Sequence, residues 1–269
     1  MKNIIIILLL IVTFNTIKAG DENKSFKFYD ETANILKAGD IKYSLFGKGE
    51  YGINENFSII LHPLMFLLSP SADLKYNFYK EADLVISSFH GFNYPTLVLN
   101  LIKNKGTGGV ISPEFDIPHT FSIRNAVIAT YKISAEHYLS AGLGFEFALN
   151  NGDLKPGTSV DLPVILPRTM VYYKNAGFDF KIISEGKLIS DFDYHLKSDL
   201  FIFPFEDDEY DYEYQSTSNS VFWEFTGTGF WNISETFKLG VGGMLCYGTY
   251  PFGTQWHLIP YLDFVKYIE

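Results

Sequence analysis

Apolar and polar residues alternate one by one along several segments of the chain. In the segment Ala72–Lys80, Leu74, Tyr76 and Phe78 alternate with charged or amide residues. A period of two places such residues on opposite faces of a β-strand, and helical periodicity cannot produce it. These segments also have the length that tilted strands need to cross a bilayer, about 9 to 11 residues. The pattern therefore predicts long strands with one apolar and one polar face.

The same reading can be extended over the whole chain, although a few segments are apolar on both faces and are identified by length and flanking turns. A further strand is implied between the connection 93–118 and the turn Lys132–Glu136. We expect the other strands at residues 25–29, 41–53, 57–68, 72–80, 85–92, 137–147, 167–183, 188–202, 221–231, 237–248 and 254–267.

Short and long connections alternate between the expected strands. The short turns fall at Asn54–Asn56, Lys80–Ala82, Lys132–Glu136, Ser184–Lys187 and Asn232–Thr236. The long connections are 93–118, 148–166 and 204–219, with short exceptions at Ser69–Ser71 and Thr249–Gly253. This is the loop pattern of membrane barrels, which have short turns on one side of the membrane and longer loops on the other.

A soluble β-sandwich shows the same alternation strand by strand, so strand length, aromatic residues near strand ends and the loop pattern distinguish a membrane barrel from it. Aromatic residues make up 17% of the chain, and several lie near strand ends, where Tyr and Trp favour the lipid–water interface. We predict an all-β fold: a single closed antiparallel up-and-down transmembrane β-barrel of about twelve strands, within a range of ten to fourteen. A soluble secreted β-protein is the alternative fold.

Charge and cysteine content exclude several classes of protein. The formal net charge is −10, so binding of nucleic acid through a basic face is not expected. Cys246 is the only cysteine, which excludes an intrachain disulfide and a multi-cysteine metal site. We expect no cofactor and no metal site.

The first twenty residues have the order of a secretory signal peptide. Lys2 precedes an apolar run from Ile4 to Phe14, and Ala19 offers a small residue at a cleavage point. The run is shorter than the roughly 20 apolar residues of a membrane-spanning helix. We therefore expect a signal peptide at residues 1–19 and a barrel formed by residues 20–269.

The last strand alternates aromatic or apolar residues with polar ones from Tyr261 to Tyr267. It resembles the C-terminal strand of Gram-negative outer-membrane β-barrel proteins, although the chain continues through Ile268 to Glu269. The resemblance implies a place in the outer membrane, contact with its lipid and recognition by the barrel assembly machinery during insertion. It covers residues 20–269 and indicates no particular activity.

If the apolar faces meet lipid, the charged faces line the lumen. Charges of both signs are present, so they either pair and fill a plugged structural barrel or line a narrow pore for small polar solutes. The candidate lumen-lining residues are Lys42, Lys48, Glu50, Asp73, Lys75, Arg124, Asp179, Lys181, Asp191, Asp193, His195, Lys197, Asp199, Glu224, His257 and Asp263.

The alternative to a non-enzymatic barrel is a lipid-modifying hydrolase of the outer membrane. Ser88 and His90 share one face of a strand, but the sequence shows no Asn or acidic partner around them, whereas His137 and Ser140 fall on opposite faces. We therefore predict no catalytic residues.

Two connections have unusual composition. The spacing of apolar residues in Pro95–Lys105 predicts a short helix at the mouth. The acidic run 206–214 is expected to be a solvated outer loop; the alternative is divalent-cation binding, although its spacing does not match the calcium loop of an EF-hand.

Overall fold

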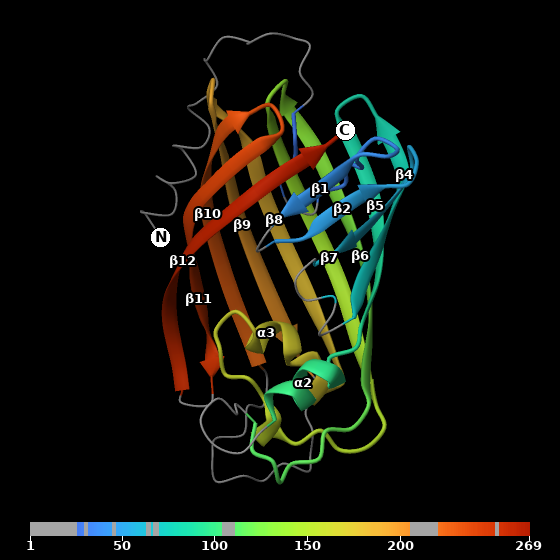
Figure 1. Cartoon of the computed structure of the whole chain (residues 1–269), viewed down its shortest axis with the longest axis vertical. Coiled ribbons are helices and arrows are strands. Elements are labelled where there is room, and N and C mark those ends of the chain that lie inside the picture. The colour runs from blue at the N-terminus through green and yellow to red at the C-terminus, as the bar shows by residue number, and fades with distance from the viewer. Residues whose placement is uncertain are drawn as a thin grey trace.

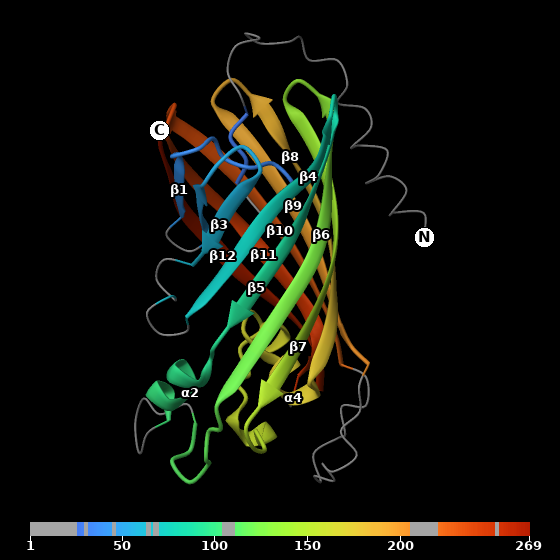
Figure 2. The same cartoon turned by 90° about the vertical axis from the view of Figure 1, so that its right-hand side faces the viewer.

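The computed structural model shows a closed barrel of twelve strands in which every neighbouring pair is antiparallel (Figures 1 and 2). The structure describes residues 26–29, 32–44, 47–62, 66, 70–103, 111–204, 220–250 and 253–269. The strands are β1 (Ile41–Ser44), β2 (Gly49–Gly52), β3 (Phe57–Leu61), β4 (Ser71–Glu81), β5 (Leu84–Asn93), β6 (Thr120–Ser134), β7 (His137–Asn150), β8 (Ala176–Ile189), β9 (Phe192–Phe203), β10 (Ser220–Ser234), β11 (Phe237–Tyr250) and β12 (Gly253–Ile268). The predicted fold class is confirmed.

The two ends of the barrel differ in their connections. Two-residue turns join β4 to β5, β6 to β7, β8 to β9 and β10 to β11, and we call this side the turn end. The opposite side, the loop end, carries the connections 94–119, 151–175 and 204–219. Helix α2 (Thr96–Ile102), the 3-10 helix η1 (Pro156–Thr158) and helices α3 (Leu166–Thr169) and α4 (Val171–Lys174) belong to these loops. The predicted alternation of short and long connections is confirmed.

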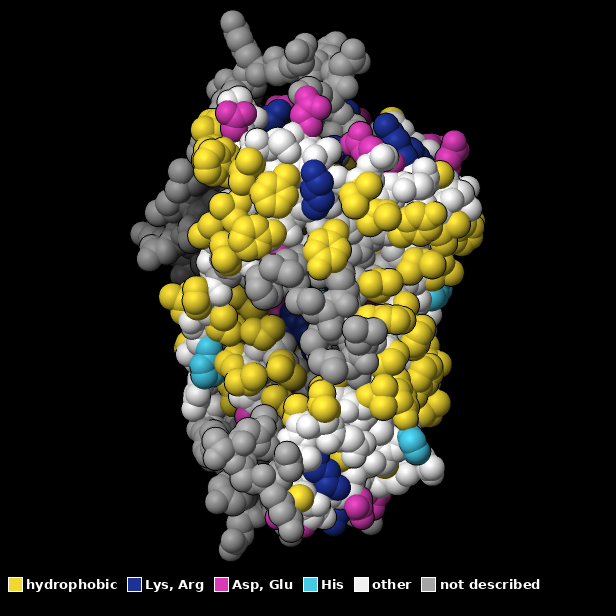
Figure 3. All heavy atoms as spheres, in the orientation of Figure 1, with side chains coloured by type: hydrophobic (Ala, Val, Ile, Leu, Met, Phe, Trp, Pro, Cys, Tyr) yellow, Lys and Arg dark blue, Asp and Glu magenta, His cyan; other side chains and the backbone are white. Residues whose placement is uncertain are grey.

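Successive side chains on the strands of the wall point alternately into the barrel and outward. On β9, Asp193 and His195 point inward and are buried, whereas Phe192 points outward and is exposed. In the space-filling view, hydrophobic side chains cover a broad band of the wall, and most visible charged side chains lie at the two ends (Figure 3). An apolar outer band around a polar interior is typical of membrane barrels. None of the helices in the described ranges is long and apolar enough to cross a membrane.

The N-terminal strands are shorter than predicted. The expected strand 41–53 is a hairpin, β1 followed by β2, whose pairs include Ile41 with Tyr51. It turns near Gly47, whose N–H donates to the Ser44 hydroxyl and whose position has no room for a Cβ. The described part of the expected strand 25–29 is not in the sheet. The count of twelve is therefore right, but one strand was assigned in the wrong place.

Two other predicted boundaries are wrong. Residues 167–174 are helical rather than extended, because Pro167 fits the first turn of a helix, where its missing N–H is not needed. Strand β8 begins only after Asn175, which ends α4 in the left-handed conformation. The turn predicted at Ser184–Lys187 lies at Ser190–Asp191, because the polar Glu185 is an inward-facing residue of β8 and not a turn residue.

The predicted short helix is present as α2. Thr96 and Leu99 are buried, whereas Leu97 and Leu101 are exposed. The Thr96 hydroxyl accepts a hydrogen bond from the Thr120 N–H, which fixes the helix to the start of β6. The signal peptide 1–19 and the acidic run 206–214 lie outside the described residues and stay predictions.

Candidate functional site

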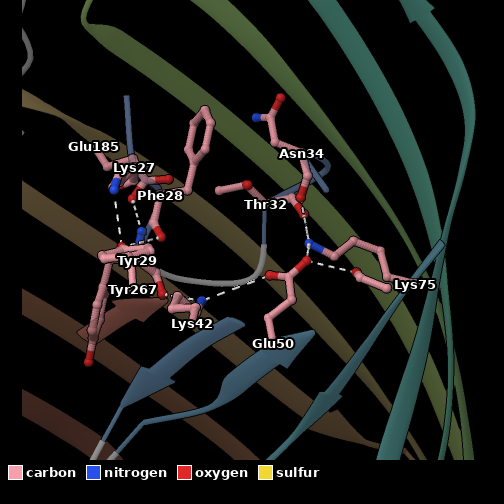
Figure 4. Close-up of polar contacts among 11 residues, drawn as sticks. Lys27, Phe28, Tyr29, Thr32, Asn34, Lys42, Glu50, Lys75, Glu185 and Tyr267 are labelled. Carbon is pink, nitrogen blue, oxygen red and sulfur yellow. Dashed lines mark hydrogen bonds and ion pairs between the residues drawn. The ribbon is translucent and has the colours of Figure 1, made fainter. Parts of the chain in front are cut away.

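Residues 26–29 and 32–36, which precede β1, lie inside the barrel at the turn end (Figure 4). We call residues 26–29 and 32–36 the N-terminal segment. Thr32 and Ala33 are 1% and 0% exposed, so the barrel encloses them completely. The segment has no strand partner, and its backbone groups bond to inward-facing side chains instead.

Backbone carbonyl groups of the N-terminal segment accept hydrogen bonds from lysines of the wall. Lys238 Nζ lies 3.0 Å from the Lys27 carbonyl oxygen, and Lys42 Nζ lies 2.7 Å from that of Tyr29. Lys75 Nζ lies 2.5 Å from the Asn34 oxygen and 3.3 Å from the Thr32 oxygen. Buried carbonyl groups need such partners, and here the wall supplies them as charged donors.

Hydroxyl and carboxylate groups bind the remaining backbone atoms. Ser87 donates to the Ala33 oxygen at 2.6 Å, and the Ala33 N–H donates to the Thr130 hydroxyl at 2.8 Å. The Tyr29 N–H donates to Glu185 at 3.1 Å. Tyr267 donates to the Phe28 oxygen at 2.9 Å. The contacts come from β1, β4, β5, β6, β8, β11 and β12, so they surround the segment.

The side chains of the N-terminal segment fill the lumen as well. Ala33 belongs to a buried cluster with Ile60, Phe89, Ile128 and Ile183. The Tyr29 ring lies 4.4 Å from the Phe230 ring, and its hydroxyl donates to Asp263 at 2.8 Å. Apolar packing and polar contacts thus both hold the segment in the lumen at the turn end.

The charges beside the N-terminal segment are paired. Glu50 lies 2.7 Å from Lys75 and 3.9 Å from Lys42, and it accepts from Ser58 at 2.7 Å. Lys238 pairs with Asp193 at 2.6 Å. Pairing offsets the cost of removing these charges from water. The arrangement therefore favours a filled interior at this end.

The connection 151–175 folds into the loop end of the barrel. This loop packs against inward-facing residues of the wall in a cluster of Leu99, Ile111, Ala148, Leu154, Leu166, Met170, Val171, Tyr172, Phe203, Phe222 and Tyr250. Tyr172 is 1% exposed, and its hydroxyl accepts a hydrogen bond from Asn93. Most of the cluster is apolar, in contrast to the contacts at the turn end.

An ion pair joins the loop 151–175 to the charged interior. Both terminal nitrogens of Arg168 donate to the Glu224 carboxylate at 2.7 Å, and the guanidinium lies over the Phe201 ring. Farther inside, Arg124 and Asp179 form a second two-bond pair at 3.1 and 2.8 Å. Two-bond pairing fixes the geometry of these charges.

The structure places most predicted lumen-lining residues inside the barrel; their part in conduction stays a prediction. Buried inward-facing members are Lys42, Glu50, Lys75, Asp179, Lys181, Asp193, His195, Asp199, Glu224 and Asp263. Asp73, Arg124, Lys197 and His257 are half-buried. Lys48 is more exposed and pairs with Asp73 at 2.8 Å. The prediction for Asp191 is wrong, because this residue lies exposed in the β8–β9 turn.

A second polar cluster lies on the outer face of the wall. His90 Nε2 lies 3.1 Å from Ser88 Oγ, and His90 Nδ1 lies 2.7 Å from Asn125 Oδ1. The expectation that Ser88 and His90 lack an Asn or acidic partner is therefore wrong. Asn125 comes from β6, where it is directly opposite His90 in the register. It interrupts an outward series that reads Phe121, Ile123, Asn125, Val127, Ala129 and Tyr131, which is the signal that could have found it.

The other histidine considered in the sequence has different contacts. His137 contacts the Tyr194 hydroxyl at 3.3 Å, and Ser140 points inward to Thr130 at 2.8 Å. This pair is not brought together. Among the described residues, no group of three or more His, Cys, Asp or Glu side chains is placed to hold a metal ion.

Comparisons with known proteins give similarity in fold alone. No protein-family model matches the sequence, and no curated protein matches it at a significant level. OmpT of Vibrio cholerae is 9% identical over 82% of this chain, with a TM-score of 0.44. The chain spans 64% of the length of that OmpT chain. An outer membrane channel of Pseudomonas putida F1 is 7% identical, with a TM-score of 0.43, over 90% of this chain and all of the other.

The channel DcaP of Acinetobacter baumannii is 10% identical over 91% of this chain and 67% of its own, with a TM-score of 0.40. The chain thus resembles outer-membrane β-barrel channels in fold at low sequence identity. The predicted resemblance to this class is confirmed at that level.

Proposed function

We propose that the protein lies in the outer membrane as a barrel closed by its own chain, and that it does not conduct solutes in this state. The observation that supports this most directly is the N-terminal segment, whose backbone is bonded to inward-facing side chains around the lumen. Charged donors hold it on several sides. A narrow pore for small polar solutes is the alternative.

The pore alternative needs a continuous wet path through the barrel. The turn end is occupied by Thr32 and Ala33, both enclosed, and the loop end by the mostly apolar cluster around Tyr172. Several inward charges between them form ion pairs, as Arg124 does with Asp179 and Lys197 with Asp199. Filling of a narrow barrel by its own side chains and chain segments favours the closed form.

The membrane location rests on the outer face. Long strands of 10 to 16 residues, β4 to β12, form most of the wall, and strands of this length cross a bilayer. Their outward residues include most of the exposed large hydrophobic side chains, and the face in Figure 3 shows an apolar band of such side chains. We infer that the signal peptide delivers the chain to the periplasm and that the loop end faces outward, as in other barrels of this class.

Conductance in planar bilayers tests the closed state. We expect no stable ohmic steps from the refolded wild-type barrel, or from variants that lack either residues 26–36 or the loop 155–173 alone. The variant that lacks both should conduct, because both closures are then removed. Folding of each variant is checked by its mobility on a gel before and after heating.

The closed state would be contradicted if the wild type gave stable conductance steps and if the ion selectivity of these steps differed in the variant Asp193→Asn. Asp193 is buried in the lumen, whereas Asp191 lies in the exposed turn two residues away. Asp191→Asn is therefore a matched control that should leave any conductance unchanged. Selectivity that depends on Asp193 alone would establish a pore.

A further inference from the structure

Ser88, His90 and Asn125 are brought together by two adjacent strands. Ser88 and His90 are two residues apart on β5, so their side chains share the outward face. Asn125 on β6 is paired with His90 in the register, which places its side chain beside the imidazole. Both strands are hydrogen-bonded on either side, so the three side chains stand on a rigid part of the wall.

The two hydrogen bonds of His90 select one tautomer. The Asn125 carbonyl oxygen can only accept, so the Nδ1–H of His90 donates to it at 2.7 Å. Nε2 then has no proton and accepts from the Ser88 hydroxyl at 3.1 Å. An imidazole that accepts the serine proton and is oriented by a third group is the arrangement that activates a serine nucleophile.

The surroundings of these three residues are apolar and face the lipid. On β5, Ile86 and Phe92 flank the pair, and on β6, Ile123 and Val127 flank Asn125. Phe92 and Val127 are 42% and 47% exposed. Polar side chains in contact with hydrocarbon cost free energy and commonly mark functional sites in membranes. The wall itself does not need a serine, a histidine and an asparagine here.

An asparagine as the third group suits this position. An ionised carboxylate that faces hydrocarbon carries a large desolvation cost, whereas an amide orients the imidazole without a charge. The same neutral choice occurs in cysteine proteases that use a Cys-His-Asn arrangement. The amide therefore makes the cluster compatible with a lipid-facing wall.

We propose that the outer wall carries a serine esterase site that cleaves acyl esters of membrane lipid. Ser88 Oγ attacks the ester carbonyl carbon as His90 Nε2 takes its proton, and the alcohol leaves with that proton, which gives an acyl-serine. Water then attacks the acyl-serine, His90 takes a proton from it and returns it to Ser88, and a fatty acid leaves. Asn125 is a positioning residue that orients His90.

The place of the site along the strands favours a lipid substrate. Phe92 is two residues from His90, and Phe121 is four residues from Asn125, both toward the loop end. At about 3.3 Å per residue, the site lies roughly 7 to 13 Å along the strands from these aromatic rings. Ester groups of lipids lie near the boundary of the hydrocarbon region, so the leaflet at the loop end presents them within reach of Ser88.

A long-chain fluorophosphonate tests whether Ser88 is an activated nucleophile. The refolded full barrel should be labelled on Ser88, as identified by mass spectrometry of the peptide, and Ser88→Ala should abolish the label. Ser198→Ala is the matched control, because Ser198 also lies on a strand in the wall but accepts from Trp223 and contacts no histidine. Absence of label on a correctly folded wild-type barrel would overturn the proposal.

Hydrolysis in detergent micelles that contain phosphatidylethanolamine tests the reaction and the substrate. We expect release of fatty acid by the wild type, none by Ser88→Ala, and a fall of about 10²- to 10⁴-fold in His90→Ala, the range of general-base catalysis. Asn125→Ala should lower kcat more than it changes KM, and Asn125→Asp should restore part of kcat, because it can still orient His90. Hydrolysis that survives in Ser88→Ala, or cleavage of a soluble short-chain ester alone, would overturn the assignment.

Discussion

The two ends of the lumen are filled in different ways. At the loop end, the connection 151–175 folds helices onto the wall and buries a mostly apolar cluster around Tyr172. At the turn end, an extended segment is held by its backbone, mainly through the lysines Lys42, Lys75 and Lys238. The first closure depends on burial of apolar surface, and the second on charged hydrogen bonds.

This difference means that the two closures respond to different perturbations. The free energy gained from apolar burial falls in proportion to the apolar surface removed. The stability of the packed loop at the loop end should therefore depend on side-chain size. Charge-assisted hydrogen bonds depend on each donor and on protonation. Substitutions can therefore loosen one end of the barrel and leave the other in place.

The largest effect is expected at the loop end. Tyr172→Ala should lower the free energy that holds the loop 151–175 in the mouth by about 3 to 5 kcal/mol, as for other large aromatic truncations in a core. Hydrogen exchange of the loop amides measures this opening. Tyr172→Phe, which keeps the ring and removes the hydroxyl with its bond to Asn93, should cost about 1 kcal/mol. Equal effects of the two variants would show that packing is not the main contribution.

An intermediate effect is expected from Lys75→Met at the turn end. This change removes the donor to Thr32 and Asn34 and leaves Glu50 with Lys42 as its cation. Loss of one partner of a buried ion pair lowers the free energy of unfolding by about 3 to 5 kcal/mol. We expect a smaller loss here, because Lys42 remains beside Glu50. The N-terminal segment should become accessible to protease while the barrel stays folded.

The control for Lys75→Met is the double variant with Glu50→Gln. It removes the charge that would otherwise be left without its nearer partner, so the stability of the barrel should recover in part. Protease cleavage within residues 26–36 should persist, because the Lys75 ammonium that donates to the Thr32 and Asn34 carbonyl groups is still absent. Full protection of the segment in Lys75→Met would contradict the assigned role of this lysine.

The smallest effect concerns the last residue. Lys27, 2.5 Å away, lowers the pKa of the Glu269 carboxyl below its ordinary value. A lowered folded-state pKa means that the contribution is present above the unfolded pKa and is lost as pH falls through the folded one. Exchange of amides 26–29 should be slightly faster in Glu269→Gln at neutral pH and equal to wild type in acid. A difference that persists in acid would exclude this ion pair as the cause.

Periodicity predicted most of the wall because each long strand carries the signal within itself. Strands β7, β10, β11 and β12 begin within one residue of their expected starts. The predictions failed where a residue's partner is distant in sequence. Glu185 was assigned to a turn because its partner, the Tyr29 N–H, is 156 residues away.

The candidate sites were harder to predict for the same reason. A strand was expected at residues 25–29 to complete an even count, and nothing local shows that Lys75 and Lys238 will bind the backbone of the N-terminal segment instead. The proximity of Asn125 to Ser88 and His90 can be recognised only once the register of β5 and β6 is known. Inward charges could be predicted from alternation, whereas their pairing depends on which strands meet.

The enclosure of the N-terminal segment also constrains the order of assembly. The barrel closes where β1 pairs with β12 over only four residues, Ile41–Ser44 with Val265–Ile268. Tyr267 of the same strand bonds to the Phe28 backbone. Such contacts between the two ends of a chain form late because a long loop must close first. The N-terminal segment must therefore already lie in the open lumen when β12 pairs with β1, and this last pairing encloses it.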